Sequence, residues 1–308
     1  MFVVCGEALM DVFAAGDTPT GMVLDARIGG SPFNVAVGLA RLQQPVAFLG
    51  GVSRGFLGER LLRALRDEGV DLRAVELHDA PTTLGLVGLD ARGVPSYAFY
   101  GEGAADRRLS PAALQGVPAQ ARAFQFGSYA MVVEPVASTL RLLVERERRQ
   151  RLIAYDPNVR LNVEPSVPRW RDTLAWMLPR THLLKISDED VSLLFPGEAV
   201  DTLARAWLQQ GVSMVVVTRG AQGASAWTAA ASAQAAAVPV QLVDTVGAGD
   251  TFQAALLAWL AEHDALNAQA LRALDAAALQ QALAFAARAA ALTCSRRGAD
   301  LPRRDELR

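Results

Sequence analysis

Short apolar runs rich in β-branched residues alternate with amphipathic helical patterns along most of this chain. The predicted strands include residues 2–5, 46–49, 124–126, 152–155, 182–186 and 214–218, and the predicted helices between them include 34–42, 56–68, 136–150 and 200–210. A strand followed by a crossover helix favours a parallel next strand, so this order predicts an α/β fold, doubly wound, with a mainly parallel sheet flanked by helices. The 308 residues, 51% of them hydrophobic, can form the core of a single domain, residues 1–308.

Two segments, about 12–28 and 81–101, show alternating patterns with turn residues and no helical period. The second is typical of a hairpin with its bend at residues 90–93. Such strands either extend the edge of the sheet or form a small β-sheet lid over the carboxyl ends of the parallel strands, where open α/β sheets bind ligands. We expect the lid, and a homodimer formed through it.

Composition and charge exclude several classes of protein. The net charge is −2, and the densest basic run, 146–151, is interspersed with glutamates, so no nucleic acid partner is expected. No uninterrupted apolar run approaches the roughly 18 residues of a membrane span, so no membrane partner is expected either. With only Cys5 and Cys294, no signal peptide at the N-terminus and no metal-ligand spacing among the histidines, we expect a cytoplasmic protein without a disulfide framework.

The stretch VDTVGAGDTF, residues 243–252, follows a strand-like apolar run, 240–243, and precedes a helical pattern. Its glycines can adopt positive φ, and the N–H groups of residues 247–250 can converge at the helix N-terminus, which predicts a phosphate site. Asp250 would repel an anion there, so its presence indicates the base of a phosphoryl transferase. The alternative is that Asp250 only caps the helix. Phe252 replaces the third glycine of a dinucleotide fingerprint, and no P-loop motif occurs.

Three further polar clusters each follow or adjoin a predicted element. GGSPFNVA, residues 29–36, places paired glycines before a helix predicted to begin near Asn34, which would cap the helix or bind a hydroxyl. DPNVR, 156–160, and TRGAQG, 218–223, follow predicted strands. Each cluster alone is explained by a turn, a cap or a surface ion pair. Together they predict a ligand site at the carboxyl edge of the sheet.

This set of motifs closely resembles the signatures of the ribokinase-like carbohydrate kinases, the PfkB superfamily, and those of bacterial fructokinases most of all. GGSPFNVA is similar to the N-terminal signature and DTVGAGD to the C-terminal one, and the resemblance covers essentially the whole chain. It implies a ribokinase-like fold with a β-lid and phosphorylation of a sugar hydroxyl by ATP with Mg²⁺. As in ribokinases, it also raises the possibility of K⁺ bound by the carbonyl oxygens of Asp244 and Thr245.

The resemblance also implies roles for individual residues. Asp250 would be the general base, and Gly247, Ala248 and Gly249 would form the anion hole, with Arg160 near the phosphates. The sugar would contact Asp11, Gly30, Asn34, Phe99 and Asp250, whereas the nucleotide would contact Lys185, Thr218, Gly220, Gly223 and Gly249, with adenine against the small residues of 285–294. Many members carry an Asn-x-x-Glu element that helps to organise magnesium, but this chain has SDED at 187–190. The metal ligands therefore stay unknown, and nucleotide phosphates and water would hold most of the metal's coordination sites.

The resemblance leaves the substrate open. Fructokinase is the leading interpretation, 2-keto-3-deoxygluconate kinase the second, and ribokinase or a nucleoside kinase follow; a sugar- or nucleotide-binding regulator is the non-enzyme alternative. An arginine commonly follows the aromatic pair of the lid in these families, but here Gly101 follows Phe99 and Tyr100. A keto acid needs a cation for its carboxylate, so we predict a preference for fructose. One of three other arginines can supply that cation instead: Arg107, Arg108 or Arg169.

Overall fold

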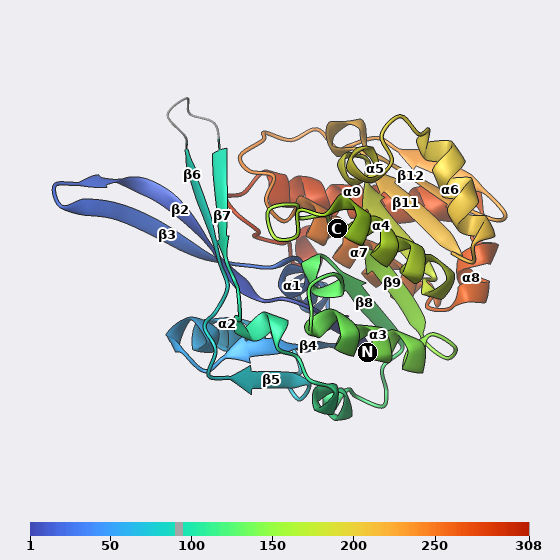
Figure 1. Ribbon diagram of the computed structural model, residues 1–308. Helices are drawn as coiled ribbons and strands as arrows, with labels where there is room; N and C mark the ends of the chain where they lie inside the picture. The colour runs from blue at the N-terminus through green and yellow to red at the C-terminus, as the bar shows by residue number, and fades with distance from the viewer. Residues whose placement is uncertain (90–94, 308) are drawn as a thin grey trace.

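A nine-stranded sheet forms the centre of the computed structural model, which describes residues 1–89 and 95–307 (Figure 1). Its order is β13–β12–β11–β10–β9–β8–β1–β4–β5, and the neighbours from β11 to β5 are parallel. The strands are β1 (Phe2–Cys5), β4 (Val46–Ser53), β5 (Val75–His78), β8 (Ala123–Gly127), β9 (Leu152–Asp156), β10 (Leu183–Ser187), β11 (Met214–Thr218), β12 (Ala224–Thr228) and β13 (Ser232–Ala235). All six predicted strands lie in the parallel part, so the predicted fold class is confirmed.

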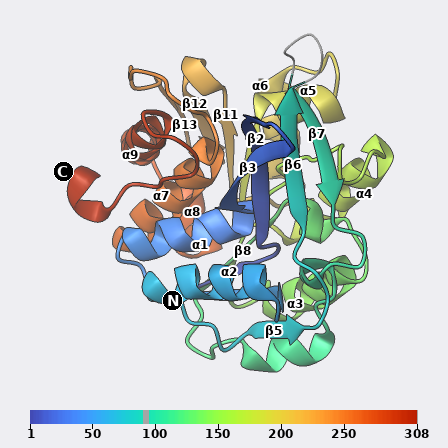
Figure 2. The same ribbon diagram turned by 90° about the vertical axis from the view of Figure 1, so that its left-hand side faces the viewer.

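Helices cover both faces of this sheet, as Figure 2 shows. One layer holds α1 (Ser31–Arg41), α2 (Phe56–Asp67), α7 (Ala248–Glu262), α8 (Ala268–Ala273) and α9 (Ala276–Cys294); the other holds α3 (Val136–Glu147), α4 (Val167–Met177), α5 (Asp188–Leu194) and α6 (Val200–Gln209). Short 3₁₀ turns occur at Ala105–Arg107, Pro111–Gly116, Tyr129–Met131, Leu178–Arg180, Gly220–Gln222 and Arg304–Leu307. Successive side chains of β1 enter opposite cores, which explains its unbroken apolar sequence.

A second, four-stranded sheet projects from the body (Figure 1). Its order is β3–β2–β6–β7, with β2 (Leu9–Thr18), β3 (Gly21–Gly29), β6 (Leu84–Leu89) and β7 (Pro95–Tyr100). β2 pairs antiparallel with β3, and β6 pairs antiparallel with β7. We call this sheet the lid. It contains both segments predicted to form antiparallel strands, but the predicted bend at 90–93 lies outside the described residues. The division of the chain into one domain with lid segments stays a prediction.

Two local predictions were wrong. Helix α1 begins at Ser31, three residues before Asn34, because Pro32 fits the first turn of a helix and Gly30 takes the preceding position with a φ of 103°. The strand-like run 240–243 is a loop: the N–H groups of Val243 and Asp244 donate to the Cys294 carbonyl at the end of α9 (2.8 and 3.2 Å). These backbone groups are therefore satisfied by a helix end and not by a neighbouring strand.

Within residues 1–89 and 95–307, none of the helices is both long enough and apolar enough to cross a membrane.

Candidate active site

The predicted polar clusters meet at the carboxyl ends of the parallel strands. Asp156 ends β9, and Lys185 is the middle residue of the neighbouring strand β10. The N-termini of α1 and α7, which are far apart in the sequence, pack side by side over this edge. The topology therefore brings together motifs from the beginning, the middle and the end of the chain, as open α/β sheets do at their binding edge.

The Asp250 carboxylate is held by two side chains of α1. Ser31 Oγ donates to Oδ1 (2.6 Å), and Asn34 Nδ2 donates to Oδ2 (2.8 Å). Residues three apart share one face of a helix, so both donors point toward the same carboxylate. Asp250 lies in the first turn of α7, yet no side chain caps this helix and its N-cap is Gly247. The carboxylate thus faces the other signature motif and does not cap its own helix.

The loop before α7 presents backbone donors. Gly247 is left-handed with a φ of 78°, and a Cβ placed on it would lie 2.6 Å from Ala299 Cβ, so this position needs glycine. Ala248 donates its N–H to the Thr245 carbonyl (3.2 Å). The N–H groups of Gly247, Gly249 and Asp250 have no acceptor among the described residues. Three of the four expected donors are therefore available, and the N–H of Ala248 is engaged within the loop.

Gly249 lies inside α7 and is not among the glycines with positive φ, so the positive φ considered for it is not observed. Space explains this glycine better: a Cβ placed on it would lie 3.3 Å from Lys185 Nζ. Lys185 itself is fixed by Asp156, whose Oδ2 lies 2.7 Å from Nζ, and both side chains are buried. Burial raises the pKa of the Asp156 carboxyl, although Lys185 opposes that shift. A buried ammonium group is therefore held directly beside the donor loop.

The sugar-contacting positions implied by the resemblance cluster at the base of the lid. Asp11 lies in β2, and burial raises the pKa of its carboxyl to about 6, with the charge of Asp250 adding to the shift and Arg160 opposing it. Cβ atoms placed on Gly29 and Gly85 would collide with the Asp11 carboxylate. The Gly85 Cβ would also lie 3.2 Å from the Phe99 ring, so Asp11 and Phe99 share one small space.

Gly30 is required by the backbone. Its φ is 103°, and a Cβ there would lie 2.8 Å from the carbonyl oxygen of Glu7. This close approach sets the start of α1 against the turn that follows β1, and it places Ser31 and Asn34 within reach of Asp250.

Arg160 is exposed and donates from Nη1 to the carbonyl of Val159 (2.9 Å). Its charge lowers the pKa of four surrounding carboxyl groups, those of Glu7, Asp11, Asp156 and Asp190. Burial still dominates at Asp190 and raises the pKa of its carboxyl to about 6. Arg160 is therefore an exposed cation among the acidic groups of this edge, whereas the cation of Lys185 is buried.

The resemblance implies that Thr218, Gly220 and Gly223 contact the nucleotide. They lie at and after the end of β11, the strand next to the one that carries Lys185. Thr218 ends β11 and pairs with Ser187 of β10. Gly220 (φ 47°) lies in the 3₁₀ turn that follows, and Gly223 (φ 87°) ends that turn. A Cβ on Gly223 would collide with the Ala235 carbonyl, so packing against β13 already explains this glycine. Along α9, Phe285 is largely buried beneath Arg304, whose Cζ lies 4.9 Å from the ring centroid.

Sequence reasoning missed two contacts of this site. Ser31 was not singled out, although its spacing of three from Asn34 within GGSPFNVA would have placed both on one helix face. Asp156 was noted only as part of DPNVR, and its pairing with Lys185 depends on the register of β9 and β10, which no local pattern reveals.

Sequence reasoning also did not predict a role for Glu7, which is 1% exposed and whose Oε2 has no hydrogen-bond partner in the described structure. Burial raises the pKa of this carboxyl to about 8. A glutamate inside an apolar N-terminal run of the sequence was the available signal, since a buried carboxyl is uncommon.

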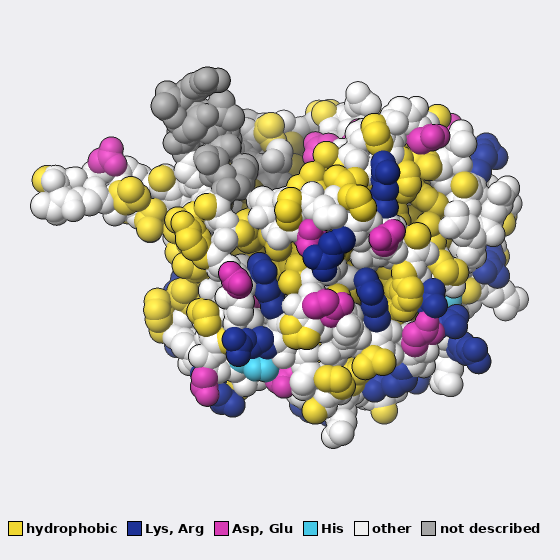
Figure 3. Space-filling model, viewed as in Figure 1, with side chains coloured by type: hydrophobic (Ala, Val, Ile, Leu, Met, Phe, Trp, Pro, Cys, Tyr) yellow, Lys and Arg dark blue, Asp and Glu magenta, His cyan; other side chains and the backbone are white. Residues whose placement is uncertain are grey.

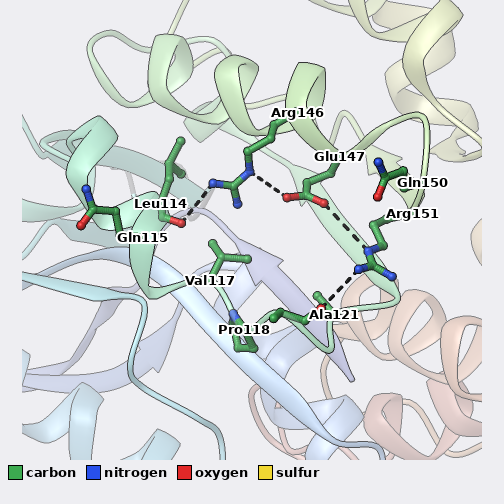
Figure 4. A pocket seen from close by; sticks show the side chains of 10 residues that line it. Leu114, Gln115, Val117, Pro118, Ala121, Arg146, Glu147, Gln150 and Arg151 are labelled. Atoms are coloured by element: carbon green, nitrogen blue, oxygen red, sulfur yellow. Dashed lines mark hydrogen bonds and ion pairs between the residues drawn. The ribbon is translucent and has the colours of Figure 1, made fainter.

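One hollow of the surface lies away from these residues (Figure 4). It is lined where α3 ends, next to the loop before β8, at the amino ends of the strands. Its arginines pair locally: Arg146 Nη1 donates to the Leu114 carbonyl (3.2 Å), and Arg151 Nη2 donates to the Ala119 carbonyl (3.2 Å). Glu147 accepts from Arg146 (2.7 Å). The two arginines of the hollow are thus engaged by neighbouring groups, and none of the predicted site residues lines it.

No three acidic, histidine or cysteine side chains within the described part of the chain converge closely enough to hold a metal ion. The carboxylates of the site face basic or neutral donors: Asp250 faces Ser31 and Asn34, and Asp156 faces Lys185. This donor set fits a metal that keeps its bonds to phosphate and water better than one bound by the protein alone.

The geometry agrees with comparisons to known proteins. A family model described as pfkB family carbohydrate kinase matches residues 1–306. A fructokinase of Rhizobium leguminosarum bv. trifolii is 35% identical over 280 residues, which cover 91% of this chain and 86% of the relative.

Two solved structures share the fold over nearly their whole length. The crystal structure of a fructokinase with bound ATP from Xylella fastidiosa has a TM-score of 0.84 and 28% identity, covering 99% of this chain and 96% of that one. A fructokinase from Vibrio cholerae O395, solved in a fructose, ADP and calcium ion bound form, has a TM-score of 0.82 and 25% identity, covering 99% and 97% of the two chains.

Proposed function

Because the chain belongs to the pfkB family of carbohydrate kinases, we propose that it transfers the γ-phosphoryl group of ATP to a hydroxyl of fructose. The observation that carries the proposal is the position of Asp250. Its carboxylate lies in the first turn of α7, beside free backbone donors and Lys185, and faces the Ser31 and Asn34 side chains. A carboxylate beside an anion site suits proton removal from a hydroxyl more than anion binding alone. The fructokinase relatives support fructose as the sugar.

In this proposal Asp250 accepts the proton of the attacking hydroxyl while that hydroxyl's oxygen bonds to the γ-phosphorus. The bond between the γ-phosphorus and the oxygen that bridges it to the β-phosphate breaks, and ADP leaves. The N–H groups of Gly247 and Gly249 stabilise the charge on the phosphoryl oxygens, and Lys185 adds a fixed cation. Ala248 contributes less than its neighbours, because its N–H donates to Thr245. Arg160, exposed at the same edge, supplies a second cation as the phosphates enter.

The sugar would lie between the lid and α1. Asp11 accepts from its hydroxyls, Asn34 contacts it next to Asp250, Phe99 packs against its apolar face, and Gly30 allows close approach of the main chain. ATP would lie along the ends of β10 and β11, near Thr218, Gly220 and Gly223, with adenine against the residues 285–294 of α9. These assignments are supported by the contacts of Asp11, Asn34 and Lys185 at one edge of the sheet.

ATP and a divalent metal are the expected cofactors, since related kinases have been solved with ATP and with ADP and calcium. We propose Mg²⁺ as the working metal, held by the nucleotide phosphates and water. K⁺ is a further proposal, with the carbonyl oxygens of Asp244 and Thr245 as ligands. Turnover in potassium chloride compared with tetramethylammonium chloride of equal ionic strength tests it, and equal rates would contradict it.

The partners are small molecules, sugar and ATP. We propose no nucleic acid partner, because the net charge is −2 and basic and acidic side chains are interspersed on the face shown in Figure 3. We further propose that the enzyme works in the cytoplasm and forms a homodimer through the lid, whose outer strand exposes the apolar side chains Met22, Val23 and Leu24.

A second candidate substrate, 2-keto-3-deoxygluconate, is favoured by one observation. Gly101 stands where an arginine commonly follows the aromatic pair, but a Cβ placed there would lie 2.7 Å from Arg107 Nη2. The guanidinium of Arg107 lies over the ring of Tyr129, which in turn packs edge-on against Phe99. Arg107 is thus close enough to the lid base to replace the missing cation, whereas Arg108 donates to the Gly103 carbonyl and Arg169 pairs with Glu164.

The test is a coupled assay of sugar-dependent ADP release over ketoses, pentoses, keto acids and nucleosides. We expect a higher kcat/KM for D-fructose than for 2-keto-3-deoxygluconate at saturating ATP and Mg²⁺. Arg107→Gln should leave fructose turnover largely unchanged and lower turnover of the keto acid. The reverse order of substrates would contradict fructose and leave the kinase assignment intact, while nucleotide or sugar binding without ADP release would favour a regulator.

A further inference from the structure

The lid touches the loop of the general base through a chain of charges. Arg27 of lid strand β3 has its Nη1 3.9 Å from Asp244 Oδ2, and Asp244 is the first residue of the DTVGAGD motif. The guanidinium is fixed on its other side: Nε and Nη2 both donate to Asp25 (3.0 and 2.6 Å), and Cζ lies 4.9 Å from the ring centroid of Phe13. Arg27 is therefore a preorganised cation, aimed from the lid at the body.

Asp244 shapes the loop that leads to the anion hole. Its Oδ1 accepts from the Val246 N–H (3.0 Å), and its Oδ2 accepts from the Gly298 N–H (2.8 Å). Gly298 also borders the lid cation, since a Cβ on it would lie 3.3 Å from Arg27 Nη1. The next residue, Ala299, packs against Gly247, the N-cap of α7. One carboxylate thus joins the lid, the segment after α9 and the turn before Gly247.

We propose that Arg27 is a positioning residue that couples the lid to the phosphate-binding loop through Asp244. The inference rests on the proposed function, in which the lid contacts the sugar and the loop contacts the phosphates. A lid that moves onto a sugar carries Arg27 with it, and the pairing with Asp244 then changes the position of the Gly247 turn. Sugar binding and nucleotide binding therefore strengthen each other, by the same factor in both directions.

The experiment measures fructose affinity by calorimetry, with and without a saturating non-hydrolysable ATP analogue and Mg²⁺. We expect the analogue to tighten fructose binding to the wild type at least about 5-fold, a typical coupling between two sites. Arg27→Met keeps the apolar contact with Phe13 but loses the charge, so this factor should fall to about 1. Arg27→Lys keeps a cation and should restore much of the coupling. Turnover should follow, with kcat lowered more than the KM of fructose is raised.

A second set of variants, which includes Asp244→Asn, tests whether Arg27 acts through Asp244. If Arg27 acts through Asp244, the double variant Arg27→Met with Asp244→Asn is no less coupled than Asp244→Asn alone. Arg297→Met is the matched control, because Arg297 Nη2 approaches Asp25 (3.7 Å) in the same charge chain but no contact joins it to Asp244 in the described structure. Its coupling should equal that of the wild type. Thermal unfolding of each variant shows that it is folded.

Two outcomes would overturn the inference: an Arg27→Met enzyme as strongly coupled as the wild type, or a wild type without any coupling. If Asp244→Asn does not fold, the comparison of Arg27→Met with Arg27→Lys still tests the inference. Failure of the proposed function has a different signature, since the wild type would then release no ADP with fructose. In that case the coupling is measured with the sugar that gave the highest kcat/KM in the screen.

Discussion

Both oxygens of the Asp250 carboxylate accept hydrogen bonds, and both donors belong to α1. A sugar hydroxyl that reaches this carboxylate must share it with Ser31 and Asn34 or displace one of them. Asp250→Asn retains the shape but cannot accept the proton, so kcat should fall by roughly 10²–10⁴. Fructose affinity, measured by calorimetry, should change far less. Near-normal turnover would show that Asp250 is not the base and that its role is structural.

Gly249 offers a second test at this scale. A Cβ there would lie 3.3 Å from Lys185 Nζ, and the branched side chain of Gly249→Val would extend further into the space beside the donor N–H groups. We expect a folded protein, judged by its thermal unfolding, whose ATP-dependent turnover is lost almost completely. Gly249→Ala adds the Cβ alone and should be affected less. A folded and fully active Gly249→Val enzyme would contradict the anion hole.

The pH dependence of sugar phosphorylation tests Asp11. Burial raises the pKa of its carboxyl to about 6, so the group loses its charge as the pH falls through that value. A protonated carboxyl accepts hydrogen bonds from hydroxyls poorly, so kcat/KM for fructose should decline below about pH 6. Asp190 titrates in the same range, so Asp190→Asn serves as the control. If kcat/KM of the Asp11→Asn enzyme declines at low pH in the same way as that of the wild type, Asp11 does not cause the decline.

Single residues with a dense local motif were the most predictable part of the site. GAGD predicted a carboxylate next to backbone donors at a helix N-terminus, and the structure places them there. The local sequence could not reveal which groups face that carboxylate, because Ser31 and Asn34 are 219 and 216 positions away. The pairing of Lys185 with Asp156 depends likewise on two strands meeting in register.

At the scale of elements, the outer strand of the lid, β3, exposes apolar side chains to solvent. Met22, Val23 and Leu24 are 63, 49 and 48% exposed, an apolar stretch on a strand that belongs to a small sheet. Consecutive exposed apolar residues on a strand indicate a contact surface. We expect dimers at micromolar concentration in sedimentation velocity. Leu24→Glu should yield monomers, while Asp17→Asn, a change of charge on the same lid, should not. A monomeric wild type would contradict the homodimer.

Helices and strands were predicted correctly where the apolar pattern was strong. The predictions failed where contacts with other elements determined the structure. The six strands buried on both faces were recognised, since their runs of Val, Ile, Leu and Phe have few alternatives. Strands β12 and β13 were missed because ASAWT and SAQA are rich in alanine and serine, which have low β-propensity. Pairing stabilises them instead: β12 pairs with β11, and β13 pairs with β12. The run 240–243 has the propensity but is bonded to the end of α9.

At the scale of the whole molecule, the buried carboxyl of Glu7 should make the free energy of unfolding depend on pH. The folded state raises the pKa of this group to about 8, whereas an unfolded chain leaves it near its ordinary value of 4.5. Between these values the folded state binds more protons, so the free energy of unfolding falls as the pH rises, by up to about 1.4 kcal/mol per pH unit. Asp11 and Asp190 act with the same sign but complete their titration near pH 6 to 7.

Glu7→Gln removes this titration. Denaturant unfolding between pH 6.5 and 8.5 should therefore show a flatter profile for the variant than for the wild type, with the variant the more stable protein at pH 8.5. Gln also leaves no charge to bury, which agrees with the unpartnered Oε2 of Glu7. Two parallel profiles would show that Glu7 is not the group responsible.

The bonds from Ser31 and Asn34 to Asp250 also have a consequence for the synthesis of the protein. At about 5 to 20 residues per second, Asn34 leaves the ribosome roughly 10 to 40 s before Asp250. During that interval the nascent chain carries the Ser31 hydroxyl and the Asn34 amide without the carboxylate that they bind. The lid strands and α1 must wait for α7, the partner that packs against α1. A chain released before residue 250 therefore lacks the carboxylate that Ser31 and Asn34 bind, and we expect it to release no ADP with any sugar.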